Sequence, residues 1–196
     1  MRRSSRIRVS GLRLIDTHDA RADDASQVES HGREDGARHN LPSQLTSFVG
    51  RERELADIKR LLATTRILTL VGAGGIGKTR LAIQAAAHLD TSAERVWFID
   101  LAAFSDAALV TQAVASALDV REQPDRLVLD TLIDVLRPRR ALLLLDNCEH
   151  LVNACALLAA GLLRACPGLS LLATSREPLG VSGETVWRVP PLSLPM

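Results

Sequence analysis

The segment that most limits what this chain can fold into is a glycine-rich stretch, GAGGIGKT, at residues 72–79. It follows the short apolar run ILTLV and precedes residues with apolar side chains at helical spacing. The stretch matches the pattern G-x-x-x-x-G-K-[ST]. A strand before such a loop and a helix after it are the structural context that the pattern requires. With 12 glycines and only two lysines in 196 residues, chance would produce the pattern about 0.001 times in the chain. The stretch therefore predicts a loop with a chemical role.

The residue types in this loop suit the binding of a phosphate chain. Glycines let the backbone turn successive N–H groups inward, and the N-terminus of the following helix adds a partial positive charge. Lys78 supplies a compact cation for the outer phosphates, and the Thr79 hydroxyl can ligate Mg²⁺. We therefore predict a nucleotide site that comprises Gly72, Ala73, Gly74, Gly75, Ile76, Gly77, Lys78, Thr79 and Arg80.

Strand-like and helix-like segments alternate over most of the chain. The spacing predicts helices over 51–63, 78–89, 109–118, 129–136 and 151–163, and strands over 67–71, 95–101, 141–146, 169–175 and 184–189. Such alternation is typical of a parallel sheet, and the unbroken apolar run ALLLL predicts a sheet that is covered on both faces. The expected fold class is α/β: a P-loop NTPase with a parallel five-stranded sheet and helices on both faces.

The first forty residues differ from the rest of the chain. They are rich in Asp, Glu and Arg, and after Ile15 they hold scarcely any large apolar side chain. Such a segment cannot bury enough apolar surface to offset the entropy lost on ordering. We therefore expect residues 1–40 to be a flexible, disordered leader or linker and residues 41–196 to form one nucleotide-binding domain.

Composition narrows the functions that we expect. The 24 basic and 23 acidic side chains leave a net charge of +1, which gives no electrostatic reason for binding nucleic acid or a membrane surface. Aromatic residues make up only 3%, which disfavours a platform for stacking bases. Three cysteines without a CxxC pair predict small apolar side chains rather than a zinc site or disulfides. Because no secretory signal or membrane-spanning run is visible, we expect a cytoplasmic protein.

Another group of chemically active side chains follows the run ALLLL. Asp146 ends that run, and a carboxylate at this point beside a phosphate loop is typical of a Mg²⁺ site, the alternative being a cap for the next helix. The next residue, Asn147, cannot act as a general base. Glu149 is a weak candidate for the base and His150 a weaker one, because both also suit the first turn of the following helix. We therefore expect slow hydrolysis.

The strand-like run LLATS leads directly into Arg176. Because the carboxyl ends of parallel strands form the ligand edge of such sheets, Arg176 is predicted to lie near the phosphates. An arginine can bind a γ-phosphate through two parallel hydrogen bonds. The alternative is an ordinary surface arginine, since the chain holds 22 of them.

Together, four motifs resemble a known family. They are FVGRERE at 48–54, LTLVGAGGIGKTRLA at 68–82, LLLLDNCEHL at 142–151 and LLATSREPLGVSGE at 171–184. In this order they resemble the nucleotide-binding module of the STAND-class, NB-ARC-like ATPases, an AAA-like group. More narrowly, they are similar to bacterial ATPases fused to SARP-type or LuxR-family transcriptional regulators. The resemblance covers roughly residues 41–195.

The resemblance implies a role for each matching position. Val49, Gly50 and Arg51 correspond to the box that meets the adenine and ribose. Residues 72–79 correspond to Walker A, with Lys78 on the phosphates. Asp146 corresponds to Walker B and, with Thr79, to the Mg²⁺ ligands. Arg176 corresponds to the sensor arginine of a Thr-Ser-Arg motif.

The resemblance also implies what the module does. In that family ADP holds a closed form, and exchange for ATP opens it and permits oligomerisation or release of an effector domain. The implied cofactors are ATP or ADP and Mg²⁺. The implied partners are effector or sensor domains of the same family or further copies of the chain, with no nucleic acid or membrane bound by this chain itself. Because the two ligands differ by one phosphate, the switch must rest on contacts such as those of Lys78 and Arg176.

Parts of that family's layout are missing from this sequence. The helical lid, the winged helix and the C-terminal repeat sensor are not present, so we expect a fragment, a truncated product or one piece of a split regulator. Two other functions stay open. One is a degenerate interaction domain without turnover, and the other is a P-loop kinase for a small molecule, which lacks a visible acceptor lid and base. A GTPase is disfavoured because no Asn-Lys-x-Asp motif occurs.

Overall fold

The computed structural model describes residues 39–43, 50–88 and 95–191. Almost all of the predicted leader, and Val49 with it, lies outside the described residues. The disorder predicted for the leader therefore stays a prediction.

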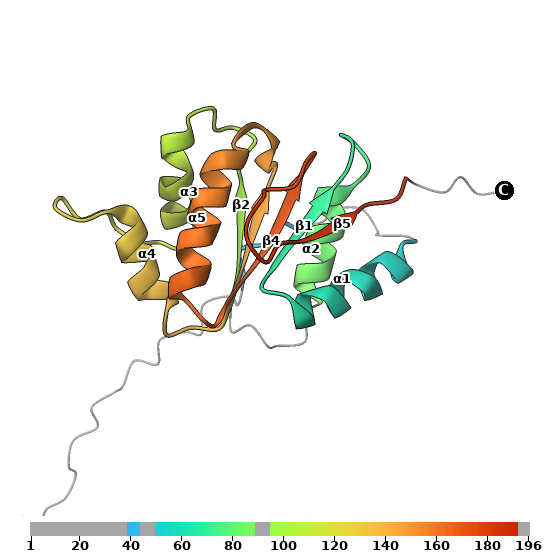
Figure 1. Ribbon diagram of the computed structural model, residues 1–196, viewed down its shortest axis with the longest axis horizontal. Helices are drawn as coiled ribbons and strands as arrows, with labels where there is room; N and C mark the ends of the chain where they lie inside the picture. Colours follow the sequence, from blue (N-terminus) through green and yellow to red (C-terminus); the bar gives the residue numbers. More distant parts are fainter. Residues whose placement is uncertain (1–38, 44–49, 89–94, 192–196) are drawn as a thin grey trace, which may run out of the picture. The chain divides into compact units, whose positions relative to one another are not determined.

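Helices and strands alternate along the described part of the chain, as the sequence predicts (Figure 1). The strands are β1 (Ile67–Val71), β2 (Arg95–Asp100), β3 (Ala141–Asp146), β4 (Leu169–Ser175) and β5 (Thr185–Arg188). The α-helices are α1 (Glu52–Thr64), α2 (Lys78–Ala87), α3 (Val110–Ala117), α4 (Val128–Leu136) and α5 (Val152–Ala165). Two short 3₁₀ helices, η1 (Ala107–Leu109) and η2 (Cys148–His150), precede α3 and α5.

The five strands form one parallel sheet in the order β2-β3-β4-β1-β5. Helices α1 and α2 cover one face, and α3, α4 and α5 lie on the other (Figure 1). The predicted fold class is confirmed by this arrangement. Because all strands run in the same direction, the loops that follow β1, β3 and β4 meet at one edge of the sheet.

Two apolar clusters, one on each face, hold these layers together. In β3, Leu143 and Leu145 belong to the cluster beneath α3, α4 and α5. Leu142 and Leu144 belong to the cluster beneath α1 and α2. Side chains that alternate along a strand point to opposite faces, so a central strand needs an apolar residue at every position. This is why ALLLL lacks the polar alternation of a half-exposed strand.

The outer edge of β2 is covered by a short segment that precedes α1. His39 forms a parallel bridge with Val96. The Asn40 side chain pairs with both main-chain groups of Phe98: Nδ2 donates to the carbonyl at 3.0 Å and Oδ1 accepts from the N–H at 2.6 Å. Both His39 and Asn40 fall within the predicted leader, and both contact the sheet.

A loop of residues 176–184 returns from the end of β4 to the start of β5. Its shape is held by Glu184, whose carboxylate accepts hydrogen bonds from Leu179 N at 2.9 Å and Gly180 N at 2.7 Å. The Glu184 N–H donates to the Val181 carbonyl at 3.0 Å. The loop that begins with Arg176 is therefore closed upon itself without a helix.

The structure bears on the predictions made for the cysteines and for membrane-spanning segments. Cys148, Cys155 and Cys166 are free and buried, as expected of small apolar side chains. Among the described residues, none of the helices is both long and apolar enough to cross a membrane.

Candidate nucleotide-binding site

The glycine-rich loop connects β1 to α2 at the carboxyl edge of the sheet. Gly75 and Gly77 have φ angles of +78° and +87°, in the left-handed region that strongly favours glycine. At Gly72 a Cβ would lie 2.3 Å from Ile76 Cδ1, so a larger residue there would displace the end of the Ile76 side chain. The partly buried Ile76 side chain packs against the cluster beneath α1 and α2, so it anchors the loop on the core.

Lys78 begins α2 and is buried. Its ammonium donates hydrogen bonds to the carbonyls of Gly72 and Ala73, each at 3.0 Å. The cation therefore bends back over the loop from which it emerges and ties the two ends of that loop together. Arg80 lies two residues further on, in the first turn of α2.

Asp146 lies beside this helix and is only 1% exposed. Its Oδ1 accepts a hydrogen bond from Thr79 Oγ1 at 2.8 Å and another from Thr174 Oγ1. Burial raises the pKa of the Asp146 carboxyl, and the charges of Asp100 and Glu149 act in the same direction. The two threonine hydroxyls oppose that increase in pKa.

Asn147 connects Asp146 to the neighbouring strand. Its backbone is left-handed, with φ of 60° and ψ of 47°, a conformation that asparagine tolerates better than most residues. Its Nδ2 donates to Asp100 Oδ1 at 2.9 Å and to Asp146 Oδ2 at 3.1 Å. Its main-chain N–H donates to Thr174 Oγ1 at 3.0 Å. Both oxygens of Asp146 are thus hydrogen-bonded within the protein.

Asp100 was not predicted as a site residue, and Thr174 was predicted only as the first residue of the Thr-Ser-Arg motif, with no role of its own. Each stands at or beside the carboxyl end of a strand, in LLATS and RVWFID, and that position was the available signal. Thr174 is fully buried, and its hydroxyl joins the turn after β3 to the Asp146 carboxylate.

Arg176 and Glu149 form an ion pair across the same edge. Arg176 Nε lies 3.1 Å from Glu149 Oε1, and the two side chains are 67% and 21% exposed. Glu149 Oε2 is buried without a hydrogen-bond partner among the described residues. A Cβ built on Gly74 would lie 3.8 Å from Arg176 Nη2, so this guanidinium reaches the phosphate loop.

An open cavity of about 420 Å³ lies beside the ion pair. It is lined by Ala102, Asn147, Glu149, His150, Arg176 and Glu177. His150 Nε2 lies 3.1 Å from the carbonyl of Leu101 and 2.6 Å from that of Phe104. These contacts give His150 a structural role, because its ring holds the turn that follows β2.

Gly50 and Arg51 directly precede α1. Both have left-handed backbones, with φ of 77° and 66°. Arg51 Nη2 donates to the carbonyl of Pro190 at 3.2 Å, and Nη1 is buried without a partner among the described residues. Val189 N donates to the carbonyl of Val71 at 2.9 Å. Arg51 thus lies next to the segment that pairs with the end of β1.

The oxygen atoms around Asp146 fit a hard divalent cation. Mg²⁺ prefers one or two protein oxygens together with phosphate and water, and the Thr79 hydroxyl and the Asp146 carboxylate meet that requirement. Among the described residues, no group of three or more His, Cys, Asp or Glu side chains is arranged to hold a metal alone. This arrangement suits a cation that shares its ligands with a nucleotide.

A comparison with protein families now assigns the class of the domain. The family model described as an AAA domain matches residues 60–179, more than half of the chain. The chain therefore belongs to this family of P-loop ATPase domains. Membership implies nucleotide binding, typically with Mg²⁺.

Among curated proteins, two relatives from Mycobacterium tuberculosis (strain ATCC 25618 / H37Rv) are similar to the chain. An uncharacterized protein is 46% identical over 159 residues, which are 80% of this chain and 40% of that protein. A protein named "Putative HTH-type transcriptional regulator" is 47% identical over 137 residues, which are 70% of this chain and 15% of that protein. The chain thus spans less than half the length of these relatives.

Solved structures support the same fold at low sequence identity. Cdc6p from Pyrobaculum aerophilum superposes with a TM-score of 0.55 at 21% identity, over 76% of this chain and 46% of that one. The ORC2 protein of Aeropyrum pernix, solved as ADPNP and ADP complexes, gives 0.51 at 13% identity, over 66% and 42%. Both establish the AAA-like P-loop fold.

Proposed function

We propose that the chain is an ATP- and ADP-binding switch module of a bacterial signalling or transcriptional regulator, with slow Mg²⁺-dependent hydrolysis of ATP. The observation that carries the proposal is the junction of the glycine-rich loop with Asp146: Lys78 lies buried within the loop, and Thr79 contacts the carboxylate at 2.8 Å. These groups supply a cation and a pair of hard oxygen ligands at one edge of the sheet.

Each residue at this edge has a proposed task. The N–H groups of residues 74–79 and the Lys78 ammonium bind the phosphates. Thr79 and Asp146 hold Mg²⁺, which neutralises phosphate charge when it is bound. Val49, Gly50 and Arg51 contact the adenine and ribose. The unpartnered Arg51 Nη1 is a donor that is available for this contact.

Arg176 is the proposed sensor of the γ-phosphate. Its guanidinium lies beside Gly74, and only its Nε is engaged in an ion pair within the described residues. A contact made to ATP and not to ADP is what a nucleotide switch requires, because a ligand shifts a conformational equilibrium only by its differential affinity.

Slow hydrolysis is expected because the base is weak or absent. Asn147 follows the metal carboxylate and has no acidic group. Glu149 remains a candidate base, although its Oε1 is held by Arg176. If it is the base, Glu149→Gln abolishes turnover at saturating Mg-ATP. Unchanged turnover in a phosphate-release assay would remove it from that role.

The wider protein is proposed from similarity alone. The regulator relative supports a place in transcriptional control, and the four motifs support the NB-ARC-like, STAND-class type found with SARP and LuxR regulators. We place the module in the cytoplasm, where ATP and ADP are exchanged. Effector or sensor domains of the same family, or further copies of the chain, are its proposed partners.

Titration calorimetry of the purified chain with Mg-ATP, ADP and GTP tests the function directly. The proposal expects both adenine nucleotides to bind at one site and GTP to bind more weakly. Equal affinity for GTP would contradict an adenine switch. Absence of binding by all three would instead indicate an interaction domain that has lost its ligand.

A further inference from the structure

We propose that Glu149 is a positioning residue for Arg176: it holds the guanidinium by Nε, directs the remaining nitrogens at the phosphate loop, and thereby sets the preference for ATP over ADP. This inference rests on the proposed nucleotide function and deepens it. It gives Glu149 a task that is separate from that of a general base.

The two partners differ in how firmly the fold holds them. Glu149 belongs to η2, between the buried Cys148 and His150, whose ring contacts two carbonyls. Its side chain is 21% exposed, whereas that of Arg176 is 67% exposed. A long, exposed arginine loses much rotamer entropy when it is fixed. The rigid partner can therefore orient the mobile one, and the reverse is not expected.

The geometry of the pair leaves the phosphate-facing side of the arginine open. Glu149 Oε1 accepts from Nε at 3.1 Å, and Nη2 lies beside Gly74. Within the described residues, neither Nη1 nor Nη2 makes a hydrogen bond to another protein group. A guanidinium presents five donors in a fixed plane, so one edge can be anchored while the other binds an oxyanion. Anchoring in this way reduces the side-chain entropy that Arg176 would lose on binding the third phosphate.

Within the described residues, the Glu149 carboxylate accepts a hydrogen bond only from Arg176. Glu149 Oε2 is buried and has no partner within the described residues, and loss of Arg176 would leave the whole carboxylate unpaired. The carboxylates of Asp146 and Glu149 lie close enough to repel one another, and this adds to the negative potential at Glu149. The Glu149 carboxylate therefore attracts the Arg176 guanidinium through contacts within the protein alone.

A competing view of the same pair predicts the opposite sign. If Glu149 withheld Arg176 from the nucleotide, removing the carboxylate would free the arginine and strengthen ATP binding. If Glu149 positions Arg176, removing the carboxylate weakens ATP binding and leaves ADP binding nearly unchanged. The ratio of the two affinities separates these views, and a purely structural role for Glu149 would not move it.

The test measures Kd for ADP and for the β,γ-imido analogue of ATP, with Mg²⁺, on the whole chain and its variants. Glu149→Ala is expected to lower the preference for the triphosphate about two- to fivefold, the size of a partly exposed ion pair. Glu149→Gln keeps an oxygen acceptor and should give a smaller change in the same direction. If circular dichroism shows that the Glu149→Ala variant is unfolded, Glu149→Gln takes its place in the test. Glu122→Ala removes an equal charge at an exposed position and should leave the ratio unchanged.

An Arg176→Ala background shows whether Glu149 acts through the arginine. In that background Glu149→Ala should change the ratio no further. An unchanged ratio in the single Glu149 variants, an increased ratio, or an equal decrease without Arg176 would each overturn the inference while nucleotide binding survives. If the wild-type chain binds neither nucleotide, the proposed function falls and this inference falls with it.

Discussion

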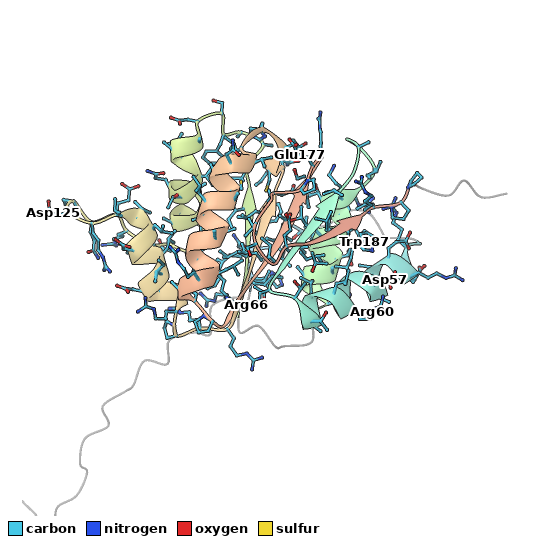
Figure 2. All side chains as sticks on the ribbon, viewed as in Figure 1. Asp57, Arg60, Arg66, Asp125, Glu177 and Trp187 are labelled. Carbon is cyan, nitrogen blue, oxygen red and sulfur yellow. The ribbon has the colours of Figure 1, made fainter. Side chains whose placement is uncertain are left out.

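At the amino ends of the strands, Arg66 donates from Nε and Nη2 to the carbonyls of Leu169 and Cys166, so that its guanidinium is bound to the backbone of the fold. At the carboxyl ends, Arg176 donates from Nε to one carboxylate oxygen of Glu149, and its Nη1 and Nη2 have no hydrogen-bond partner among the described residues. Figure 2 shows the two ends of the sheet, with Arg66 labelled at one and Glu177, the neighbour of Arg176, at the other.

Glycines at the two ends of the sheet are required for different reasons. Gly168 is required by packing, since a Cβ there would lie 2.4 Å from the main-chain oxygen of Arg139. Gly75 has nothing within 4 Å of its built Cβ and is required by a φ of +78°. One end of the sheet is thus closed by contacts within the protein, and the other keeps donors and space available for a ligand.

The largest expected effect is at the loop itself. Lys78→Ala removes a buried cation and two hydrogen bonds, and the loss of a charge-assisted contact to phosphate should weaken nucleotide binding by roughly ten- to a hundredfold. Calorimetry with Mg-ATP measures this change. The matched control is Lys59→Ala in α1, the other lysine of the chain, which should bind normally. Equal binding by both variants would mean that the loop does not hold the phosphates.

A substitution at the amino ends of the strands should change the stability of the protein and leave nucleotide binding unchanged. Gly168→Ala forces a side chain against the backbone and should lower the free energy of unfolding by about 1–3 kcal/mol, measured by urea denaturation. The folded fraction should keep the wild-type Kd for ATP. Gly75→Ala is the contrasting variant, because its left-handed strain costs about 1–2 kcal/mol and its loop should lose affinity. A binding defect in folded Gly168→Ala would break the distinction between the two ends.

Asp146→Asn should weaken nucleotide binding without lowering the stability of the protein. Burial raises the pKa of Asp146, so its charged form opposes folding at neutral pH. The asparagine variant should therefore bind Mg-ATP more weakly and be at least as stable as the wild type at pH 7.

The pH dependence of this difference gives a control. As the pH falls through the raised pKa of the folded protein toward that of the unfolded chain, the wild type takes up its proton and the advantage of asparagine should disappear. Thermal unfolding of both proteins from pH 7 down to pH 4 measures the effect. An advantage that grows toward low pH would contradict the assigned sign.

The smallest expected effect is in the loop that leads from Arg176 to β5. Glu184→Gln replaces a carboxylate that accepts from two main-chain N–H groups, so stability should fall by about 1 kcal/mol. Chemical denaturation measures the loss. The preference for ATP over ADP should remain, because Arg176 keeps its anchor at Glu149. A larger change in that preference than in Glu149→Ala would transfer the positioning role to Glu184.

Local pattern and chemistry predicted most of the fold. Apolar runs without alternation, such as ALLLL, and helical spacing after each of them specify a covered parallel sheet. The loop of residues 72–79 was predictable because its glycines and its lysine obey strict spacing. Topology then places the ends of β1, β3 and β4 at one edge.

Contacts between distant segments were not predictable from the sequence. The pairing of Glu149 with Arg176 joins residues 27 positions apart, and no local rule selects it from the many other pairs of charges. Thr174 gave no signal of its bond to Asp146, because a threonine also suits any strand. Asn40 was assigned to a polar leader, and only the position of β2 at the sheet edge gives its amide a role.

The most direct test of the nucleotide site is a crystal structure of the chain with Mg²⁺ and the β,γ-imido analogue of ATP. The account predicts phosphates against the N–H groups of residues 74–79, with Lys78 Nζ moved from the carbonyls of Gly72 and Ala73 onto the outer phosphates. It also predicts an Arg176 Nη on the third phosphate while Nε stays on Glu149. An analogue bound elsewhere, with Lys78 still held by its two carbonyls, would contradict the account.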